Sequence, residues 1–174
     1  MERAGSAAFA LLRERFPRAR RIAVVCGPGN NGGDGYVLAR LAKEAGLEAV
    51  VLSPASTAGL KGDASAAYAA WRKADGPTQS FSVAPLQACD VIVDALFGTG
   101  VERPLVGEWR AAIEAMNASG KPVFAIDIPS GLHADSGRVL GAAVRAALTL
   151  SFIGLKAGLF TGQGREHSGL ILFD

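Results

Sequence analysis

A glycine-rich segment is the first part of this sequence that could do chemistry. It runs from Gly27 to Gly35, reads Gly-Pro-Gly-Asn-Asn-Gly-Gly-Asp-Gly, and directly follows the apolar run Ile22 to Cys26. Because glycine carries no Cβ, the backbone of such a turn can come close to a phosphate or a sugar. Five glycines with Asn30, Asn31 and Asp34 are also more than a tight turn needs. We therefore predict a ligand site here.

The spacing Gly27-x-Gly29-x-x-Gly32 matches the glycine pattern of dinucleotide-binding folds. Two features argue against an ordinary nicotinamide dehydrogenase. Pro28 places a ring without an N–H in the turn, and the second apolar run ends in Leu52-Ser-Pro54, with no acidic residue for a ribose. A P-loop is excluded, since no Lys-Ser or Lys-Thr follows the glycines.

Two aspartates lie in or just after other apolar runs. Asp94 belongs to the run Val91 to Leu96, and Asp127 to the run Val123 to Ile128. A half-buried carboxylate is disfavoured as an ion unless backbone N–H groups or a cation satisfy it. Each aspartate could simply cap the turn that follows. Two of them facing the Asn30-Asn31 turn favour a shared site.

Four further residues are candidate reactive groups. The segment around Ser130 lacks the leading glycine of Gly-x-Ser-x-Gly, which argues against a serine hydrolase. His133 and His167 lie in no motif and are expected in solvated loops. Lys156 follows the apolar run Leu148 to Ile153, so it is either a surface charge or a group that faces a substrate at the same sheet edge.

Short apolar runs, rich in Val, Ile and Leu, must position these residues. They are continuous rather than alternating, which is typical of parallel strands covered on both faces. The runs are 22–26, 49–52, 91–96, 123–128, 148–153 and 170–173, with a weaker one at 81–83. Helical patterns lie between them at 36–45, 63–73 and 108–118. The alternation predicts an α/β fold, a three-layer α/β/α Rossmann-like open, mostly parallel sheet with helices on both faces, whose ligands bind beyond the carboxyl ends of the strands.

Composition indicates one globular domain. The chain has 174 residues, of which 49% are hydrophobic and 20% charged, and its formal net charge is +2. The densest basic stretch, Arg13 to Arg21, is interrupted by apolar and acidic residues, so no nucleic acid is expected as a partner. No apolar run approaches the roughly 18 residues of a membrane span, and the start is not a signal peptide. Cys26 and Cys89 are expected to be buried free thiols, and we predict a cytoplasmic protein.

With these residues assembled, the sequence closely resembles the YjeF N-terminal domain, the NAD(P)H-hydrate epimerase family. The motifs that carry the resemblance are Met1-Glu-Arg-Ala-Gly5, Gly27 to Gly35, Val93 to Gly100, Ile126 to Gly131 and Lys156-x-Gly158. They cover nearly the whole chain, so residues 1–174 are expected to form one such domain. The family normally has a helix before the first motif, where this chain starts, so truncation at the N-terminus is expected. Many bacterial relatives carry a C-terminal dehydratase domain, which these 174 residues lack.

The resemblance implies an isomerase of metabolite repair that interconverts the R and S epimers of hydrated NADH or NADPH. By position, its substrate contacts fall on Asn30, Asn31, Gly32, Gly33, Asp34, Gly98, Thr99, Gly100, Val101, Glu102, Arg103, Pro104 and Asp127. It also implies a potassium ion (K+) held by Asn31, Asp94 and Ser130, whose hard oxygen donors suit an alkali cation. We expect Asp127 to handle the proton of the reaction, and Lys156 is the second candidate catalytic residue.

Other function classes stay open at this point. One is a non-catalytic binding module of the same fold that recognises a nucleotide-like ligand. Another is an ordinary dehydrogenase, which would bind NAD tightly and transfer a hydride. A homodimer and a dehydratase domain or partner are the associations that the resemblance implies. The sequence does not choose between epimerisation by elimination of water and epimerisation by ring opening.

Overall fold

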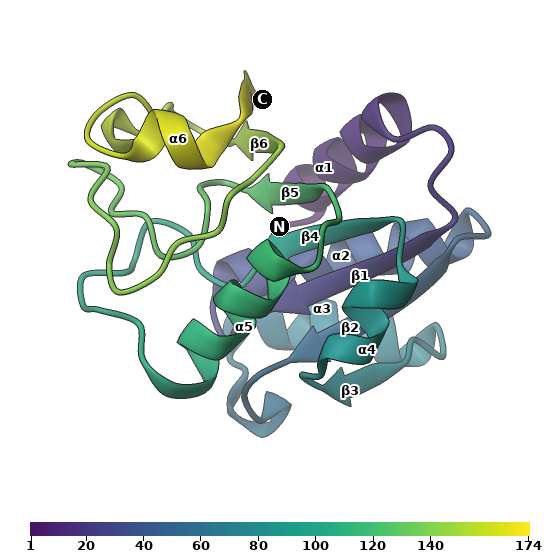
Figure 1. The fold of residues 1–174 in the computed structure, drawn as a ribbon. Coiled ribbons are helices and arrows are strands. Elements are labelled where there is room, and N and C mark those ends of the chain that lie inside the picture. The colour runs from purple at the N-terminus through teal and green to yellow at the C-terminus, as the bar shows by residue number, and fades with distance from the viewer.

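The sheet is the frame of the molecule, which is described over all 174 residues by a computed structural model. Its strands are β1 (Arg21–Cys26), β2 (Glu48–Ser53), β3 (Thr78–Ser80), β4 (Val91–Ala95), β5 (Val123–Ile126), β6 (Leu148–Ser151) and β7 (Leu170–Phe173). Seven strands in the order β3-β2-β1-β4-β5-β6-β7 form one sheet, in which every neighbouring pair is parallel (Figure 1).

Helices cover both faces of this sheet, as predicted. They are α1 (Glu2–Arg15), α2 (Asn30–Glu44), α3 (Gly62–Lys73), α4 (Val83–Ala88), α5 (Gly107–Ala118) and α6 (Gly164–Ser168), with short 3₁₀ turns at Thr57–Gly59 and Ala157–Leu159. The first three helices pack on one face, while α4 and α5 pack on the other (Figure 1). None of the helices combines the length and the apolar character that a membrane span needs.

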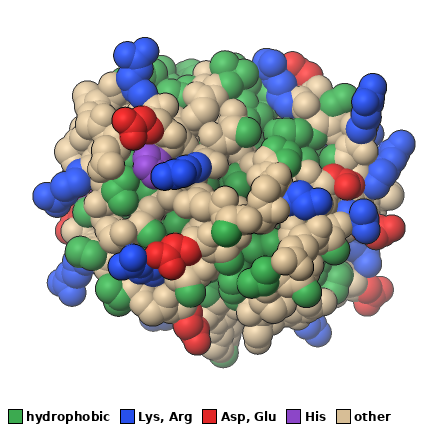
Figure 2. All heavy atoms as spheres, viewed as in Figure 1, with side chains coloured by type: hydrophobic (Ala, Val, Ile, Leu, Met, Phe, Trp, Pro, Cys, Tyr) green, Lys and Arg blue, Asp and Glu red, His purple; other side chains and the backbone are tan.

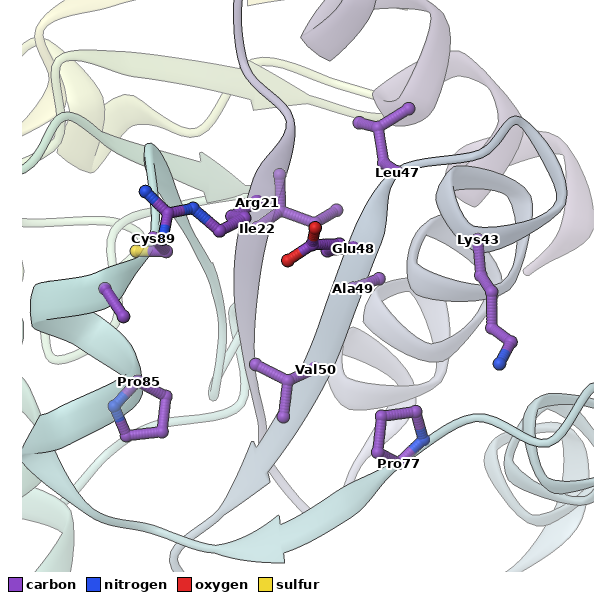
Figure 3. Close-up of a pocket in the computed structure, with 11 residues that line it drawn as sticks. Arg21, Ile22, Lys43, Leu47, Glu48, Ala49, Val50, Pro77, Pro85 and Cys89 are labelled. Carbon is purple, nitrogen blue, oxygen red and sulfur yellow. The ribbon is translucent and has the colours of Figure 1, made fainter.

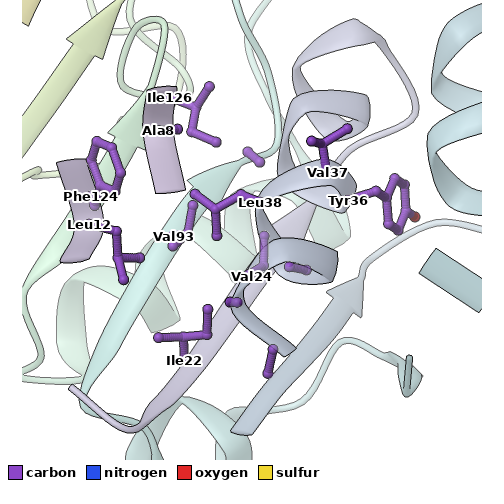
Figure 4. Close-up of a cluster of buried hydrophobic side chains, with 14 of the residues drawn as sticks. Ala8, Leu12, Ile22, Val24, Tyr36, Val37, Leu38, Val93, Phe124 and Ile126 are labelled. Atoms are coloured by element: carbon purple, nitrogen blue, oxygen red, sulfur yellow. The ribbon is translucent and has the colours of Figure 1, made fainter. Parts of the chain in front are cut away.

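The two faces of β1 show why the apolar runs are continuous. Ile22 and Val24 point to one face, where they join a core that includes Leu38 of α2 (Figure 4). Ala23 and Val25 point to the other face and belong to the core beneath α5. These four side chains of β1 are almost completely buried, because successive residues of a strand point to opposite faces and both faces are covered.

The order of the strands places the crevice of the sheet between β1 and β4. From β1 the chain proceeds outward to β2 and β3, and then returns to form β4 on the other side of β1. The segment after β1 becomes α2 on one face, and the segment after β4 leads to α5 on the other face. Neighbouring strands whose connections leave toward opposite faces open a crevice at their carboxyl ends.

Two expectations about elements are wrong. The run Phe81 to Val83 is not a strand, because the neighbouring residues Thr78–Ser80 form β3 and Val83 begins α4. Phe81 instead packs from a loop against the core beneath α5. The segment Gly27 to Gly35 is a turn only as far as Gly29, since α2 begins at Asn30.

The start of the chain also differs from the expectation. The helical patterns in the sequence begin only at residue 36, yet Glu2–Arg15 forms α1, which places Ala8 and Leu12 in the core (Figure 4). Gly5 of α1 faces α2 so closely that a Cβ would lie 2.5 Å from Val37. The motif at residues 1–5 therefore belongs to a helix that packs on the sheet layer.

Candidate functional site

A cavity of about 880 Å³ lies at the carboxyl ends of the central strands. The predicted site residues that line it are Asn30, Asn31, Asp34, Gly98, Thr99, Gly100, Val101, Asp127 and Lys156. They come from four separate connections, those that follow β1, β4, β5 and β6. The fold thus brings to one place residues that are far apart in the sequence.

The other predicted site residues lie outside the cavity wall. Asp94 and Ser130 are completely buried, and Gly32 and Gly33 are buried in the first turn of α2. Glu102, Arg103 and Pro104 are exposed and are not among the residues that line the cavity.

Asp94 and Ser130 form a buried hydrogen-bonded pair. The Ser130 N–H donates to Asp94 Oδ2 (2.8 Å), and the Ser130 hydroxyl donates to Asp94 Oδ1 (2.6 Å). The backbone N–H of Leu96 donates to the same carboxylate (3.2 Å). Burial raises the pKa of Asp94 to about 6, although these hydrogen bonds act to lower it. A carboxylate in this position would be stabilised by a nearby cation.

Asn31 lies in the first turn of α2 and has an unusual environment. Its side chain is buried, yet neither Oδ1 nor Nδ2 has a hydrogen-bond partner. A buried amide without partners is costly, so its oxygen is suited to bind a ligand that is absent from the free chain. A Cβ on Gly98 would lie 3.7 Å from Asn31 Cβ and 3.1 Å from Asp127 Oδ2, so Gly98 lies close to both side chains.

Asp127 and Lys156 form an ion pair at the cavity wall. Lys156 Nζ donates to Asp127 Oδ1, and it also donates to Phe152 O (2.8 Å) and Ser151 Oγ (3.1 Å). The two side chains are only 18% and 14% exposed. Asp127 Oδ1 accepts a further bond from the Phe152 N–H (3.4 Å), whereas Oδ2 accepts none. One oxygen of Asp127 is therefore held by the protein and the other is free on the side of Gly98.

The backbone of Asp127 is held in an uncommon conformation. Its φ is +71°, and the N–H of Ile128 donates to the carbonyl of Ile126 (3.0 Å), which makes Asp127 the centre of a γ-turn. The N–H of Asp127 donates to Leu150 O of the neighbouring strand (2.7 Å). A positive φ in a residue other than glycine is uncommon and clusters at functional sites.

Asp34 supplies a second carboxylate to the cavity. Burial raises its pKa to about 6. The N-terminal ammonium of Met1, which lies 3.9 Å from Oδ1, acts to lower this pKa, whereas the negative charge of Asp127 acts to raise it. The cavity wall therefore brings the carboxylates of Asp34 and Asp127 near one another, together with the one lysine, Lys156. This arrangement is suited to proton transfer and to a ligand that becomes positively charged.

The profile of one protein family, "YjeF-related protein N-terminus", matches residues 1–158. This chain belongs to that family. It is 44% identical over its whole length to the bifunctional NAD(P)H-hydrate repair enzyme Nnr of Escherichia coli, but spans only 34% of that protein. It thus has about a third of the length of its bifunctional relatives.

Two shorter relatives are covered much more completely. They carry the name NAD(P)H-hydrate epimerase and come from Achromobacter xylosoxidans (41% identity) and Limosilactobacillus fermentum (38% identity). The chain covers 82% of each, and 98% and 99% of its own residues are aligned. A crystal structure of the yeast protein YNL200c has a TM-score of 0.81 and 26% identity, covering 91% of this chain and 71% of that one. The resemblance seen in the sequence and the predicted fold are both confirmed.

The structure of this YjeF-family chain adds residues that the motifs did not indicate. The connection after β6 contributes Phe152, Ile153 and Leu155 to the cavity wall, and Asp135 lies at the wall as well. The apolar run 148–153 predicts that Ile153 ends a strand, although β6 ends at Ser151. The signal that could have found Phe152, Ile153 and Leu155 is their apolar character next to Lys156, whereas no signal indicated Asp135.

The expectation of two solvated histidines is wrong for His167. This residue is buried in α6. Its Nδ1 lies 2.9 Å from the carbonyl oxygen of Val144, and because a carbonyl oxygen can only accept, Nδ1 is the donor of this hydrogen bond. His133 is half-buried, and its Nδ1 accepts bonds from the N–H groups of Asp135 and Ser136. Neither histidine lines the cavity. The two cysteines are buried and free, as predicted.

A smaller cavity of about 470 Å³ lies elsewhere on the sheet, near the start of β1 and β2 (Figure 3). Arg21, Glu48, Val50 and Pro85 line it, and none of the predicted site residues does. On the molecular surface in Figure 2, acidic and basic side chains are scattered over the visible face rather than gathered by sign. The larger cavity at the carboxyl ends is therefore the candidate active site.

Proposed function

We propose that this chain is an NAD(P)H-hydrate epimerase, an isomerase that interconverts the R and S epimers of hydrated NADH or NADPH. The shorter relatives named for this activity are covered over most of their length, which supports the proposal. The observation that carries it is the Asp127–Lys156 pair in the wall of the cavity, with Asp127 Oδ2 left without a hydrogen bond. A simple binding module has no need of a carboxylate held in this way.

The substrate defines what the site must do. The carbon that is epimerised bears a hydroxyl group and is bonded to the ring nitrogen, whose lone pair can expel the hydroxyl once it is protonated. We infer that Asp127 takes up a proton from solvent on Oδ2 and passes it to that hydroxyl, so that water leaves and the ring becomes a cation. Water then adds to the other face of the ring and releases a proton to solvent.

The surrounding residues support this route. Lys156 and the Phe152 N–H hold Asp127 Oδ1, which leaves the second oxygen to exchange the proton. Asp34, on the same cavity, would stabilise the positive charge of the ring. The cavity thus favours elimination and readdition of water over ring opening, because ring opening creates no comparable cation on the ring.

We further propose a potassium ion bound by Asn31, Asp94 and Ser130. The residues fit such an ion: Asn31 Oδ1 is buried without a partner, and Asp94 is a buried carboxylate with no cationic side chain paired to it. All three supply oxygen donors, which suit a hard cation. No cluster of three or more His, Cys, Asp or Glu side chains is present to form another metal centre. When bound, the ion would neutralise Asp94 and hold the loops after β1, β4 and β5 together.

The proposed activity is tested by following the R:S ratio of hydrated NADH by chromatography. Because the ratio also drifts without enzyme, samples with and without protein are compared from the same starting epimer. The expected result is fast return to equilibrium from either side. Binding without acceleration would identify a binding module instead, and hydride transfer from unmodified NADH would identify a dehydrogenase.

The associations and the compartment of the protein stay predictions. We propose a dehydratase domain or partner that uses the S epimer, since the longer relatives carry the name bifunctional. We propose a homodimer on the resemblance to the family alone. We also propose a cytoplasmic location and no nucleic-acid partner. Size-exclusion chromatography with light scattering, run over roughly a hundredfold range of protein concentration, tests the homodimer.

A further inference from the structure

Ile153 is the most exposed large apolar residue of the chain. Its side chain is 99% exposed, and its φ is +66°. Only Asp75 and Asp127 share a positive φ among residues other than glycine, and neither is β-branched. Such a φ is a marked outlier for a β-branched residue, because its Cβ is crowded by the backbone. The sequence thus keeps an isoleucine where a glycine would fit without strain.

Hydrogen bonds of the active site impose this conformation. The N–H of Gly154 donates to the carbonyl of Phe152 (2.6 Å), so Ile153 is the centre of a γ-turn with a positive φ. The same carbonyl accepts a bond from Lys156 Nζ (2.8 Å), and the N–H of Phe152 donates to Asp127 Oδ1 (3.4 Å). The Ser151 hydroxyl donates to Gly154 O (3.3 Å). The turn is therefore tied to the ion pair that we assign to catalysis.

The side chain of Ile153 has no role within the free chain. It is not part of any hydrophobic cluster, yet it lines the cavity together with Leu155, which is 52% exposed. Other parts of the same wall are polar and include Asn30, Asp34 and Asp127. Strained residues at a ligand site persist because the surrounding structure determines them and the ligand uses them.

We propose that Ile153, with Leu155, forms an apolar platform that contacts the hydroxyl-bearing ring of the substrate on the side away from the reacting carbon. This inference rests on the proposed function. The hydrated ring is a tetrahydropyridine whose CH₂ carbons are apolar, so a platform against them leaves both faces of the hydroxyl-bearing carbon open to Asp127 and to water. The Phe152–Asp127 hydrogen bond fixes the platform next to that carboxylate. Ile153 is accordingly a positioning residue.

The test is the substitution Ile153→Gly, which removes the platform and relieves the strain. Loss of one apolar contact is expected to raise the KM for hydrated NADH about tenfold, with kcat changed less than about threefold. The melting temperature should stay the same or rise. Ile153→Leu should recover most of the affinity, whereas Leu170→Ala, at an exposed apolar residue of β7 outside the cavity, should change neither constant.

Affinity is measured in parallel by calorimetry with hydrated NADH, so that the platform is tested apart from turnover. An Ile153→Gly protein that is folded and binds as tightly as the wild type overturns the platform, even if the wild type is active. A wild type that binds but does not epimerise refutes the proposed function. The ratio of the wild-type affinity to the Ile153→Gly affinity then still tests whether Ile153 contacts the ligand. Absence of binding by the wild type overturns both.

A shortened substrate identifies the ring. Hydrated reduced nicotinamide mononucleotide lacks adenine but keeps the ring that bears the hydroxyl. If the platform contacts that ring, Ile153→Gly weakens the binding of the mononucleotide by the same factor as the binding of hydrated NADH. An effect seen with hydrated NADH alone would place adenine on Ile153 and overturn the assignment.

Discussion

At the scale of single residues, Asp127 is distinguished by the different roles of its two oxygens. Oδ1 is held by Lys156 and by a backbone N–H, while Oδ2 is free on the side of Gly98. A carboxylate arranged in this way can exchange a proton with a ligand without losing its own position. Its γ-turn and that of Ile153 follow neighbouring strands and are joined by the same hydrogen bonds.

Asp127→Asn tests the proton transfer directly. The amide keeps the shape of the side chain but cannot donate a carboxylic proton, so kcat should fall by about 10² to 10⁴-fold. Asp63→Asn, at an exposed carboxylate outside the cavity, is the matched control and should keep full activity. Circular dichroism should show both variants folded. Full epimerisation by a folded Asp127→Asn protein would disprove the assignment.

Asp34 leads to a prediction about pH. Its pKa of about 6 in the folded chain lies above the ordinary value of 3.8, chiefly because of burial. The folded state therefore binds this proton more tightly than the unfolded chain does. The resulting stability is present below about pH 4 and is lost as the pH rises through about 6.

Asp34→Asn removes this dependence. The variant should have a free energy of unfolding on the order of 2 kcal/mol above that of the wild type at pH 7, and the difference should nearly vanish at pH 4. Urea unfolding at several pH values measures it. Substrate binding should weaken in the same variant, since the carboxylate faces the cavity. A variant that is less stable than the wild type at pH 7 would contradict this account.

At the scale of elements, the first turn of α2 decides how the glycine-rich segment is built. A Cβ on Gly32 would lie 2.0 Å from the carbonyl oxygen of Gly27, whereas a Cβ on Gly29 would meet nothing within 4 Å. The helix therefore begins so close to the end of β1 that only glycine fits at one of these positions. The close approach also sets the place of Asn31, one residue earlier.

The two glycines form a matched pair of variants. Gly32→Ala should lower the free energy of unfolding by more than about 2 kcal/mol, because a backbone oxygen must move. Gly29→Ala should cost less than about 1 kcal/mol, since its φ of −101° suits alanine and the space is open. Thermal and urea unfolding compare them. Equal effects of the two substitutions would show that the Gly27 carbonyl oxygen does not lie close enough to position 32 to exclude a Cβ.

At the scale of the whole molecule, the proposed potassium site joins three loops that the sequence keeps far apart. An ion bound only by the folded chain stabilises the whole fold, by about 2.7 kcal/mol at 100 times its dissociation constant. For a chain of this size we expect a melting temperature on the order of 5 °C higher in potassium chloride than in choline chloride at the same ionic strength. Asn31→Leu should abolish the difference, while Asn30→Leu should keep it. Equal melting temperatures in both salts for the wild type would argue against the site.

The sequence by itself determined the class of fold and the part of the sheet that carries the site. Continuous runs such as Ile22 to Cys26 report burial on both faces, which is a local property that a pattern of side chains can express. The glycine-rich segment and the two aspartates could be placed for the same reason, since each lies at or near the end of such a run.

Only the tertiary structure decided how the side chains meet. The Asp127–Lys156 pair, the burial of Asp94 beneath the cavity and the exposed Ile153 depend on contacts between strands that are distant along the chain. The helix α1 and the short strand β3 likewise owe their place to what they pack against. Periodicity records which face of an element is buried. It carries no information about which distant partner a residue contacts, or about a backbone angle that such a contact imposes.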